Sequence, residues 1–354
     1  MREREALLAQ AERELARGDA ASAIGVLDRA AMMLHAADTE MALVRAYLQA
    51  GEYRRALAFC AHTAGAHRET AEPSALYAWL LHLGGQSAFA RRTLAEARAR
   101  HPAHPSLAQT ELQLESPATA GLLMAAPQPL APYAAMQGEQ LPPPPAARTL
   151  GGGVLVDSGR RALVPLETVR SARQLWVRNG LGQTAQAEVE RRIDNLGLAV
   201  LRLPLPLDIG VPMQTTPRDP FAGSPGFLIT FTKSPGAVPA WPWLQTGFHG
   251  AALGDTSERR LGFELPAGSA GGLVLDAAGR FAGIALNGAD GQSSMLPVSR
   301  LRIAAPEALV GLDDGPPTSK RMPADEAYER ALRVALQVIV LPSRDPQASG
   351  SPGD

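Results

Sequence analysis

Ser269 is the residue whose surroundings most suggest chemistry, because it lies in the glycine-rich stretch GSAGG (268–272), just before the apolar run 273–275. A serine hydroxyl acts as a nucleophile when a base takes its proton and a third group orients that base. No histidine occurs between His104 and His249. The usual base is therefore missing from most of the segment that would need it, and the pattern favours binding over hydrolysis.

Other kinds of reactive site find little support in the sequence. Cys60 is the only cysteine, which excludes an intramolecular disulfide and a cysteine-based zinc cluster and favours a reducing compartment. We identify no phosphate-cradling loop and no metal-ligand spacing. The sequence thus predicts no cofactor and no metal.

Size and charge restrict the class of protein further. At 354 residues the chain is long enough for two domains, and its net charge is −1, with lysine and arginine scattered along it. Nucleic acid is therefore not expected as a partner. The N-terminus lacks the pattern of a secretory signal, and apolar runs such as 338–341 fall far short of the ~20 residues that span a bilayer. We expect a cytoplasmic protein without direct membrane insertion.

Residues 1–115 predict a helical domain built from repeats. The segment is rich in alanine, leucine, arginine and glutamate, with apolar residues at helical spacing. Gly18, Gly51 and Gly85 recur 33 and 34 residues apart. An alanine follows each glycine five residues later, at Ala23, Ala56 and Ala90. A period of this length is typical of stacked helix pairs.

This repeat resembles the tetratricopeptide repeat. Tyr47, Ala30, Ala97 and Pro102 also fit that pattern, whereas Thr63 and Arg68 depart from it. The resemblance implies three helix pairs around a concave groove of the kind that binds peptides. It places four residues on the groove side: Arg45, Gln49, Trp79 and His82. The alternatives are that Trp79 packs between helices and that Arg45 and His82 are solvated surface residues.

Residues 116–147 interrupt the helical pattern with many prolines, including Pro142 to Pro145. Helices and strands do not tolerate this density of proline. We expect a semi-rigid spacer with a rise of roughly 3.1 Å per residue. A second interpretation is that the proline run is a ligand for an SH3-like partner.

Residues 148–310 predict a β-rich domain, because short apolar or alternating runs recur between turn residues. Many short strands at this spacing indicate a sandwich or a barrel. The expected strands are 154–156, 162–164, 175–177, 198–203, 227–231, 273–275 and 281–286.

Four stretches in order resemble a trypsin-like serine protease of the bacterial high-temperature-requirement type. They are GGGVLV (151–156), ALVPLETV (162–169), GLAVLRL (197–203) and GSAGGLVLD (268–276), followed by a closing LPVSRL (296–301). The resemblance covers about 151–305 and implies a double β-barrel. It places Glu167 at the position of the catalytic histidine, Gly197 at that of the aspartate and Ala270 at that of the serine. Leu273 departs from the pattern by replacing a proline.

A pseudoprotease is what this resemblance implies, since none of the three positions holds its catalytic residue. One alternative keeps Ser269 as a nucleophile, with His249 or Glu167 as its base. Asp194 could replace Gly197, or it could cap a turn. The backbone amides from Gly268 to Ala270 could also survive as an oxyanion-type pocket for a carboxylate.

The C-terminal region predicts one further helix at 323–341, because Tyr328, Leu332, Leu336 and Ile339 fall at helical spacing. It could pack on the rest of the chain or dock to a partner. Residues 343–354 are expected to be disordered. Trp241 and Trp243 are either packing anchors or part of a partner surface.

The sequence as a whole favours a cytoplasmic bacterial adaptor or scaffold that binds one or more proteins. Two other hypotheses remain. The chain could be a structural component of a multi-subunit secretion or envelope-associated machine, or a residual serine hydrolase that uses Ser269.

Overall fold

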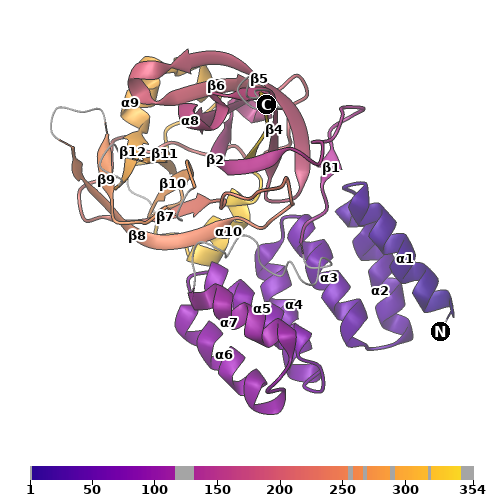
Figure 1. Cartoon of the computed structure of the whole chain (residues 1–354). Helices are drawn as coiled ribbons and strands as arrows, with labels where there is room; N and C mark the ends of the chain where they lie inside the picture. Colours follow the sequence, from indigo (N-terminus) through magenta and orange to yellow (C-terminus); the bar gives the residue numbers. More distant parts are fainter. Residues whose placement is uncertain are drawn as a thin grey trace, which may run out of the picture.

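The computed structural model describes residues 2–115, 131–253, 258–265, 269–287, 292–317 and 320–343. Helices α1 to α7 form the N-terminal part, and two closed antiparallel β-barrels form the C-terminal part (Figure 1). The predicted fold class, a helical domain followed by a trypsin-like double β-barrel, is confirmed. Within the described residues, no helix combines the length and the apolar character needed to cross a membrane.

Short turns join the N-terminal helices in pairs. The helices are α1 Arg2–Ala16, α2 Ala20–Met33, α3 Ala37–Gln49, α4 Tyr53–Ala66, α5 Glu72–Leu83, α6 Ser87–Arg100 and α7 Pro105–Glu115. Gly18, Gly51 and Gly85 lie in the turns within the three pairs, with φ of 83°, 83° and 79°. After each glycine, the next N–H donates to a carbonyl five residues back. This is the Schellman turn, whose left-handed residue favours glycine.

The periodic alanines explain how closely the paired helices approach each other. Ala23, Ala56 and Ala90 have no exposed surface, and Ala30 and Ala97 are equally buried. A methyl group at these positions leaves room for the neighbouring helix without a cavity. The sequence period therefore predicted both the helix-ending turns and the small residues of the helix contacts.

The first barrel contains six strands. They are β2 Arg148–Val156, β3 Arg161–Pro165, β4 Ala172–Asn179, β5 Gln183–Ile193, β6 Leu198–Arg202 and β13 Ala335–Pro342. Pairing of β5 with β6 closes the ring, and β13 lies between β2 and β4. A two-residue strand, β1 Ala135–Met136, adds to the edge of β5. The strand that completes this barrel therefore comes from the end of the chain.

The prediction of one helix over 323–341 is wrong. The helix α10 covers only Ala324–Ala331, and β13 begins at Ala335. The apolar spacing matched a helix because β13 is buried on both faces, so it shows no alternation of apolar and polar residues. Its Val338, Ile339 and Val340 are β-branched residues that favour a strand. The barrel domain consequently extends beyond the predicted limit of residue 310.

The second barrel contains β7 Pro225–Thr230, β8 Trp243–Ala252, β9 Arg259–Leu261, β10 Leu273–Asp276, β11 Phe281–Asn287 and β12 Ser293–Pro297. Its strands close in the order β10-β11-β12-β9-β8-β7, with β10 paired to β7. Short helices α8 Leu166–Val169 and α9 Val298–Ala304 follow β3 and β12. The seven strands expected from the sequence are all present.

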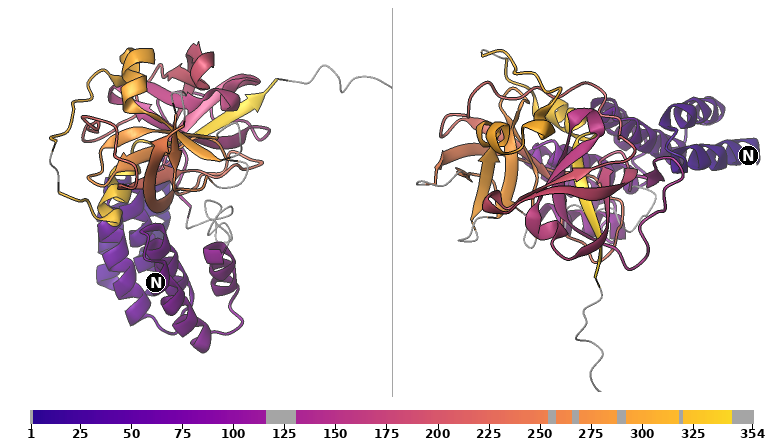
Figure 2. Two further views of the ribbon diagram at one scale, coloured as in Figure 1. Left: turned by 90° about the vertical axis from the view of Figure 1, so that its left-hand side faces the viewer. Right: turned by 90° about the horizontal axis from the view of Figure 1, so that it is seen from above.

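Helix α10 joins the helical domain to the barrels. Tyr328 is fully buried and packs edge-on against Tyr53 of α4, with ring centroids 4.6 Å apart. Its hydroxyl donates a hydrogen bond of 2.8 Å to the carbonyl of Pro242. Beside this contact, Glu329 pairs with Arg54. The C-terminal helix thus packs inside the molecule, between the helical and β-rich parts, as Figure 1 and the left-hand view of Figure 2 also show.

The described part of the proline-rich segment, 131–147, packs on both domains. Tyr133 lies on the helical domain, and β1 pairs with β5. The carbonyl of Leu141 accepts a hydrogen bond from the indole of Trp176. These residues therefore do not form the separate semi-rigid spacer that the sequence predicted, because their backbone groups find partners in both domains. The rest of that segment, 116–130, and the predicted tail from 344 onward lie outside the described residues.

Candidate functional site

The three positions that the resemblance aligns with a catalytic triad lie together where the two barrels meet. Glu167 is in α8, directly after β3, and the N–H of its neighbour Leu166 donates 2.8 Å to the carbonyl of Gly197. Asn287, at the end of β11, donates to the Glu167 carboxylate at 3.1 Å and to the Ser269 carbonyl at 3.0 Å. The fold thus brings the Glu167, Gly197 and Ala270 positions into one place, although they are far apart in the sequence.

The side chains at this place do not provide the groups that acyl transfer needs. Ala270 has no oxygen, and Gly197 has no side chain with which to orient a base. Gly197 instead adopts φ of 60° in the turn before β6. Glu167 offers an exposed carboxylate, but Asn287 already donates to it. Of the three aligned positions, two therefore carry no reactive group, and the third carries only the Glu167 carboxylate.

The loop around Ala270 is held on every side by backbone and side-chain donors. The strand β2 lies so close that a Cβ added to Gly151 would be 2.0 Å from the Ala270 carbonyl oxygen. Four consecutive carbonyls of the loop accept hydrogen bonds: Ser269 from Asn287, Ala270 from Gly152, Gly271 from Thr230 and Gly272 from Ala285. Glycine at 151 is therefore a steric requirement of this close approach.

The Ser269 hydroxyl is hydrogen-bonded to the backbone of its own chain. Its side chain is 1% exposed, and its hydroxyl oxygen accepts a hydrogen bond of 3.0 Å from the backbone N–H of Lys233. The other half of the predicted oxyanion pocket, Gly268, lies outside the described residues. The Ser269 hydroxyl, which one alternative assigned as a nucleophile, is thus buried and hydrogen-bonded to the backbone.

His249 lies at the wrong end of the barrel to serve Ser269. It is on β8 against Gly226, which pairs with Asp276 at the end of β10, whereas Ser269 precedes the start of β10. The four residues of β10 separate these ends by roughly 10 Å. Burial lowers the pKa of His249 to about 4, because a charged imidazole would lose its hydration. The hypothesis of a Ser269–His249 pair is therefore wrong.

Asp194 is exposed, and its carbonyl accepts a hydrogen bond of 3.2 Å from the N–H of Gly197. This contact closes the turn of residues 194–197 through the backbone. The interpretation of Asp194 as a turn residue fits this geometry.

The four predicted groove residues do not line an open groove. The guanidinium of Arg45 lies 3.8 Å from the ring centroid of Tyr133, and the Gln49 side chain accepts a hydrogen bond of 3.3 Å from the Tyr133 N–H. Arg45 and Gln49 are both buried. The linker of the same chain thus occupies the position where a peptide was expected, and that prediction is wrong for this pair.

Trp79 and His82, the other predicted groove residues, are covered as well. Trp79 is fully buried in the helical core, as the alternative interpretation proposed. His82 packs on Trp243 of β8, with ring centroids 4.8 Å apart, and burial lowers its pKa to about 4. Trp241 and Trp243 are both buried, so they are packing anchors within the chain.

A cluster that the sequence analysis did not single out lies in the helical domain near the C-terminal end of α4, away from the end of α4 that contacts α10. His35, Glu40 and His67 bring one ligand atom each to within 4.8 Å of one another. Within the described part of the chain, this is the one group of its kind that could hold a metal ion. The sign of this cluster in the sequence is that three of the seven histidines fall between residues 35 and 67.

No family model matches the chain, and no curated protein matches it. Similar solved structures include the MamO protease domain from Magnetospirillum magneticum in its apo form. The match has 18% identity, covers 44% of this chain and 93% of that chain, and has a TM-score of 0.31. The HtrA-type protease AlgW with a decapeptide shows 20% identity over 44% of this chain and 50% of its own, with a TM-score of 0.35. The serine endoprotease from Yersinia pestis shows 16% identity over 48% of this chain and 64% of its own, with a TM-score of 0.36. At these identities the likeness concerns the fold alone.

Proposed function

We propose that this protein is a non-catalytic scaffold that binds one or more other proteins, built from a tetratricopeptide-like helical domain and a pseudoprotease domain. The proposal rests on which residues occupy the positions aligned with the catalytic triad. Ala270 and Gly197 supply no reactive group, and Glu167 is held by Asn287. A scaffold needs the shape of the fold but none of this chemistry.

The closure of the site supports the same conclusion. The loop from Ser269 to Gly272 uses its carbonyls within the chain, and Gly151 lies against Ala270. These contacts hold the loop against the neighbouring strands and leave its carbonyls unavailable to a substrate peptide. We therefore propose that partners contact the outer surface of the molecule, and that the protein acts in the cytoplasm without a nucleic-acid partner.

One outer surface is apolar enough to suggest a protein partner. Met32, Met33 and Leu34 are consecutive exposed residues at the end of α2, and Met32 is 81% exposed. Neighbouring exposed apolar side chains are favourable contacts for a partner, and methionine adapts its shape readily. We propose that this apolar segment, residues 32–34, contributes to the binding surface.

We predict that a fluorophosphonate probe will not label the protein. The probe reacts with an activated serine, and the Ser269 hydroxyl is buried and bound by the Lys233 N–H. The measurement is intact-mass spectrometry after incubation, with an active serine protease as the positive control. Labelling that disappears in the variant Ser269→Ala would contradict the proposal and support the residual hydrolase.

We also predict that tagged protein will capture specific partner proteins from the source organism and that a variant of the apolar segment will lose them. The variant is Met32→Ser/Met33→Ser/Leu34→Ser. Because these side chains are exposed, the fold should be unaffected. Binding should fall by about tenfold or more, which corresponds to a loss of about 1.4 kcal/mol or more of apolar contact. Quantitative mass spectrometry and sizing of the captured complex provide the measurement.

Phe89→Ser, which removes another exposed apolar side chain elsewhere in the helical domain, is the matched control. Equal recovery of partners by the wild type and the triple variant would exclude the apolar segment as the binding surface. A protein that captures no partner at all would argue against the scaffold. A captured complex of many subunits would instead point to a component of a larger machine.

A further inference from the structure

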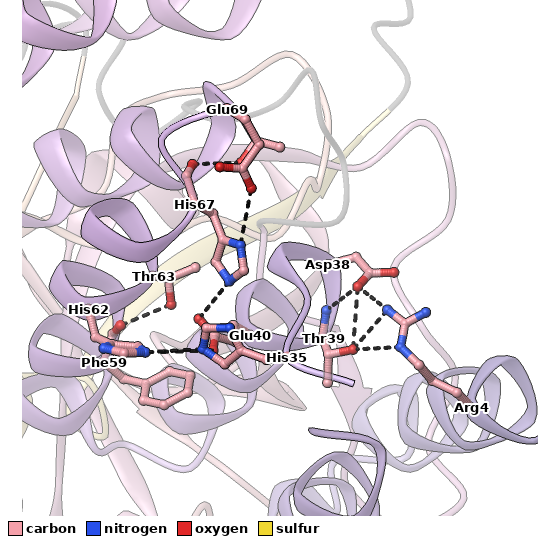
Figure 3. A network of polar contacts seen from close by, with 11 residues as sticks. Arg4, His35, Asp38, Thr39, Glu40, Phe59, His62, Thr63, His67 and Glu69 are labelled. Carbon is pink, nitrogen blue, oxygen red and sulfur yellow. Dashed lines mark hydrogen bonds and ion pairs between the residues drawn. The ribbon is translucent and has the colours of Figure 1, made fainter. Parts of the chain in front are cut away.

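Three histidines converge on one buried glutamate in the helical domain (Figure 3). Glu40 lies in the first turn of α3, His35 precedes that helix, and His62 and His67 lie at the C-terminal end of α4. The Nε2 atoms of His35 and His62 are 2.7 and 3.7 Å from Glu40 Oε1, and His67 Nε2 is 3.4 Å from Glu40 Oε2. The two exposed rings also meet, with Nε2 atoms 3.4 Å apart.

The buried members of this cluster have polar atoms without hydrogen-bond partners. Glu40 is 3% exposed and His67 is 7% exposed. Among the residues that the structure describes, neither Glu40 Oε2 nor His67 Nε2 has a hydrogen-bond partner. Leaving two buried polar atoms unsatisfied is costly, and a buried carboxylate requires a compensating positive charge. A cation between these atoms would satisfy both.

A second carboxylate, that of Glu69, lies against the other ring nitrogen of His67. Glu69 Oε1 lies 3.3 Å from His67 Nδ1. In a neutral ring, an N–H on Nδ1 donates to Glu69 and leaves the lone pair of Nε2 facing Glu40. Metal-binding histidines are commonly held in this way by a carboxylate on their other nitrogen. A lone pair that faces a carboxylate oxygen is otherwise an unfavourable arrangement.

We propose that His35, Glu40 and His67 bind one Zn²⁺ ion, with His62, whose exposed ring has its Nε2 3.4 Å from that of His35, turning in as the fourth ligand. Three imidazoles and one carboxylate are the donor set that zinc accepts in tetrahedral sites, with bonds of about 2.0 to 2.2 Å. In such a tetrahedron, neighbouring ligand atoms lie about 3.3 Å apart. The separations in the cluster are 3.4, 3.4 and 3.7 Å, close to this value, and 2.7 Å between His35 Nε2 and Glu40 Oε1, a hydrogen-bond distance that must lengthen when the ion enters. Nitrogen donors favour zinc over calcium or magnesium, which prefer oxygen ligands.

The position of the site indicates a structural role. The ion would join the loop before α3 to the end of α4, and so hold two neighbouring parts of the helical domain together. Tyr53 and Arg54, which contact α10, lie at the opposite end of α4. Zinc should therefore stabilise the helical domain without reaching the triad positions. His35 and His62 are exposed, so the ion can enter from solvent.

The test is zinc binding by untagged full-length protein that has been stripped of metal. Zn²⁺ alone is titrated in competition with a chromogenic chelator, and the metal content is then measured by mass spectrometry. We expect one equivalent of Zn²⁺ per chain and a higher midpoint of thermal unfolding when zinc is added. Cys60 is buried, so a thiol should not compete for the ion.

The variant His35→Gln/His62→Gln removes two ligands from exposed positions, so it should fold. It should bind zinc more than about 100-fold more weakly and lose the thermal shift, because losing a ligand costs more than losing a residue that only orients one. His104→Gln, which changes a partly exposed histidine outside the cluster, is the control and should bind like the wild type. Glu69→Gln, a positioning variant, should weaken zinc binding by about 10- to 100-fold.

Cobalt provides a readout of the ligand set that a purely structural cluster would not give. Co²⁺ in a tetrahedral site absorbs strongly in the visible range, and this absorption should appear in the wild type and disappear in the double variant. If the wild type takes up no zinc, or if the double variant takes up as much as the wild type, the proposal is overturned. The cluster is then a network of charged imidazoles and carboxylates without a metal.

Discussion

A chain that ends after Val334 should fail to form the first barrel. The deletion removes β13, which pairs with β2 on one side and with β4 on the other. It also removes the buried side chains of Leu336, Val338, Ile339 and Val340. At roughly 1.5–3 kcal/mol each, their burial amounts to about 6–12 kcal/mol, which is comparable with the whole stability of about 5–15 kcal/mol of a typical protein.

Amide hydrogen exchange provides the measurement, because the N–H groups of β2 and β4 lose their partners in the truncated chain. A chain that ends after Ser343 is the matched control, since every pairing of β13 lies at or before Pro342. The control should keep the protection of β2 and β4, and the shorter chain should lose it. Protection of both strands in the shorter chain would show that the first barrel closes without β13.

The sequence predicted the parts of the fold that depend on local patterns. The Schellman turns at Gly18, Gly51 and Gly85 follow from the need for left-handed residues at helix ends. The short apolar strands were visible because turn residues bound them. The meeting of Glu167, Gly197 and Ala270 was visible only through the order of motifs, since nothing in their spacing along the chain specifies it.

Other features depend on tertiary contacts and could not be read from the sequence. The strand β13 was mistaken for a helix because a strand buried on both faces has no alternation. The strand β5 was missed because its exposed residues make it polar. Tyr133 covers Arg45 and Gln49 from a segment that looked like a spacer. The histidine cluster needs the α3–α4 packing to bring together ligands that no metal-binding motif connects.

Replacing Tyr328 with alanine should separate the helical domain from the barrels. Both Tyr328 and Tyr53 are fully buried at their contact, and burial raises the pKa of each phenol well above its ordinary value. Removing a large buried aromatic ring typically costs about 3–5 kcal/mol. We expect Tyr328→Ala to lower the free energy of unfolding by this amount and to split one thermal transition into two, since the two parts would no longer unfold together.

Tyr328→Phe distinguishes the ring from the hydroxyl. This variant keeps the packing on Tyr53 but removes the hydrogen bond to the Pro242 carbonyl, which should cost about 1–3 kcal/mol because a buried carbonyl loses its donor. A double-mutant cycle of Tyr328→Ala with Tyr53→Ala should give a coupling energy of about 0.5–1.5 kcal/mol for the edge-on aromatic pair.

Calorimetry of the wild type and of each variant provides the measurement. A single transition at an unchanged midpoint in Tyr328→Ala would mean that other contacts, such as Arg54 with Glu329, suffice to hold the two parts together.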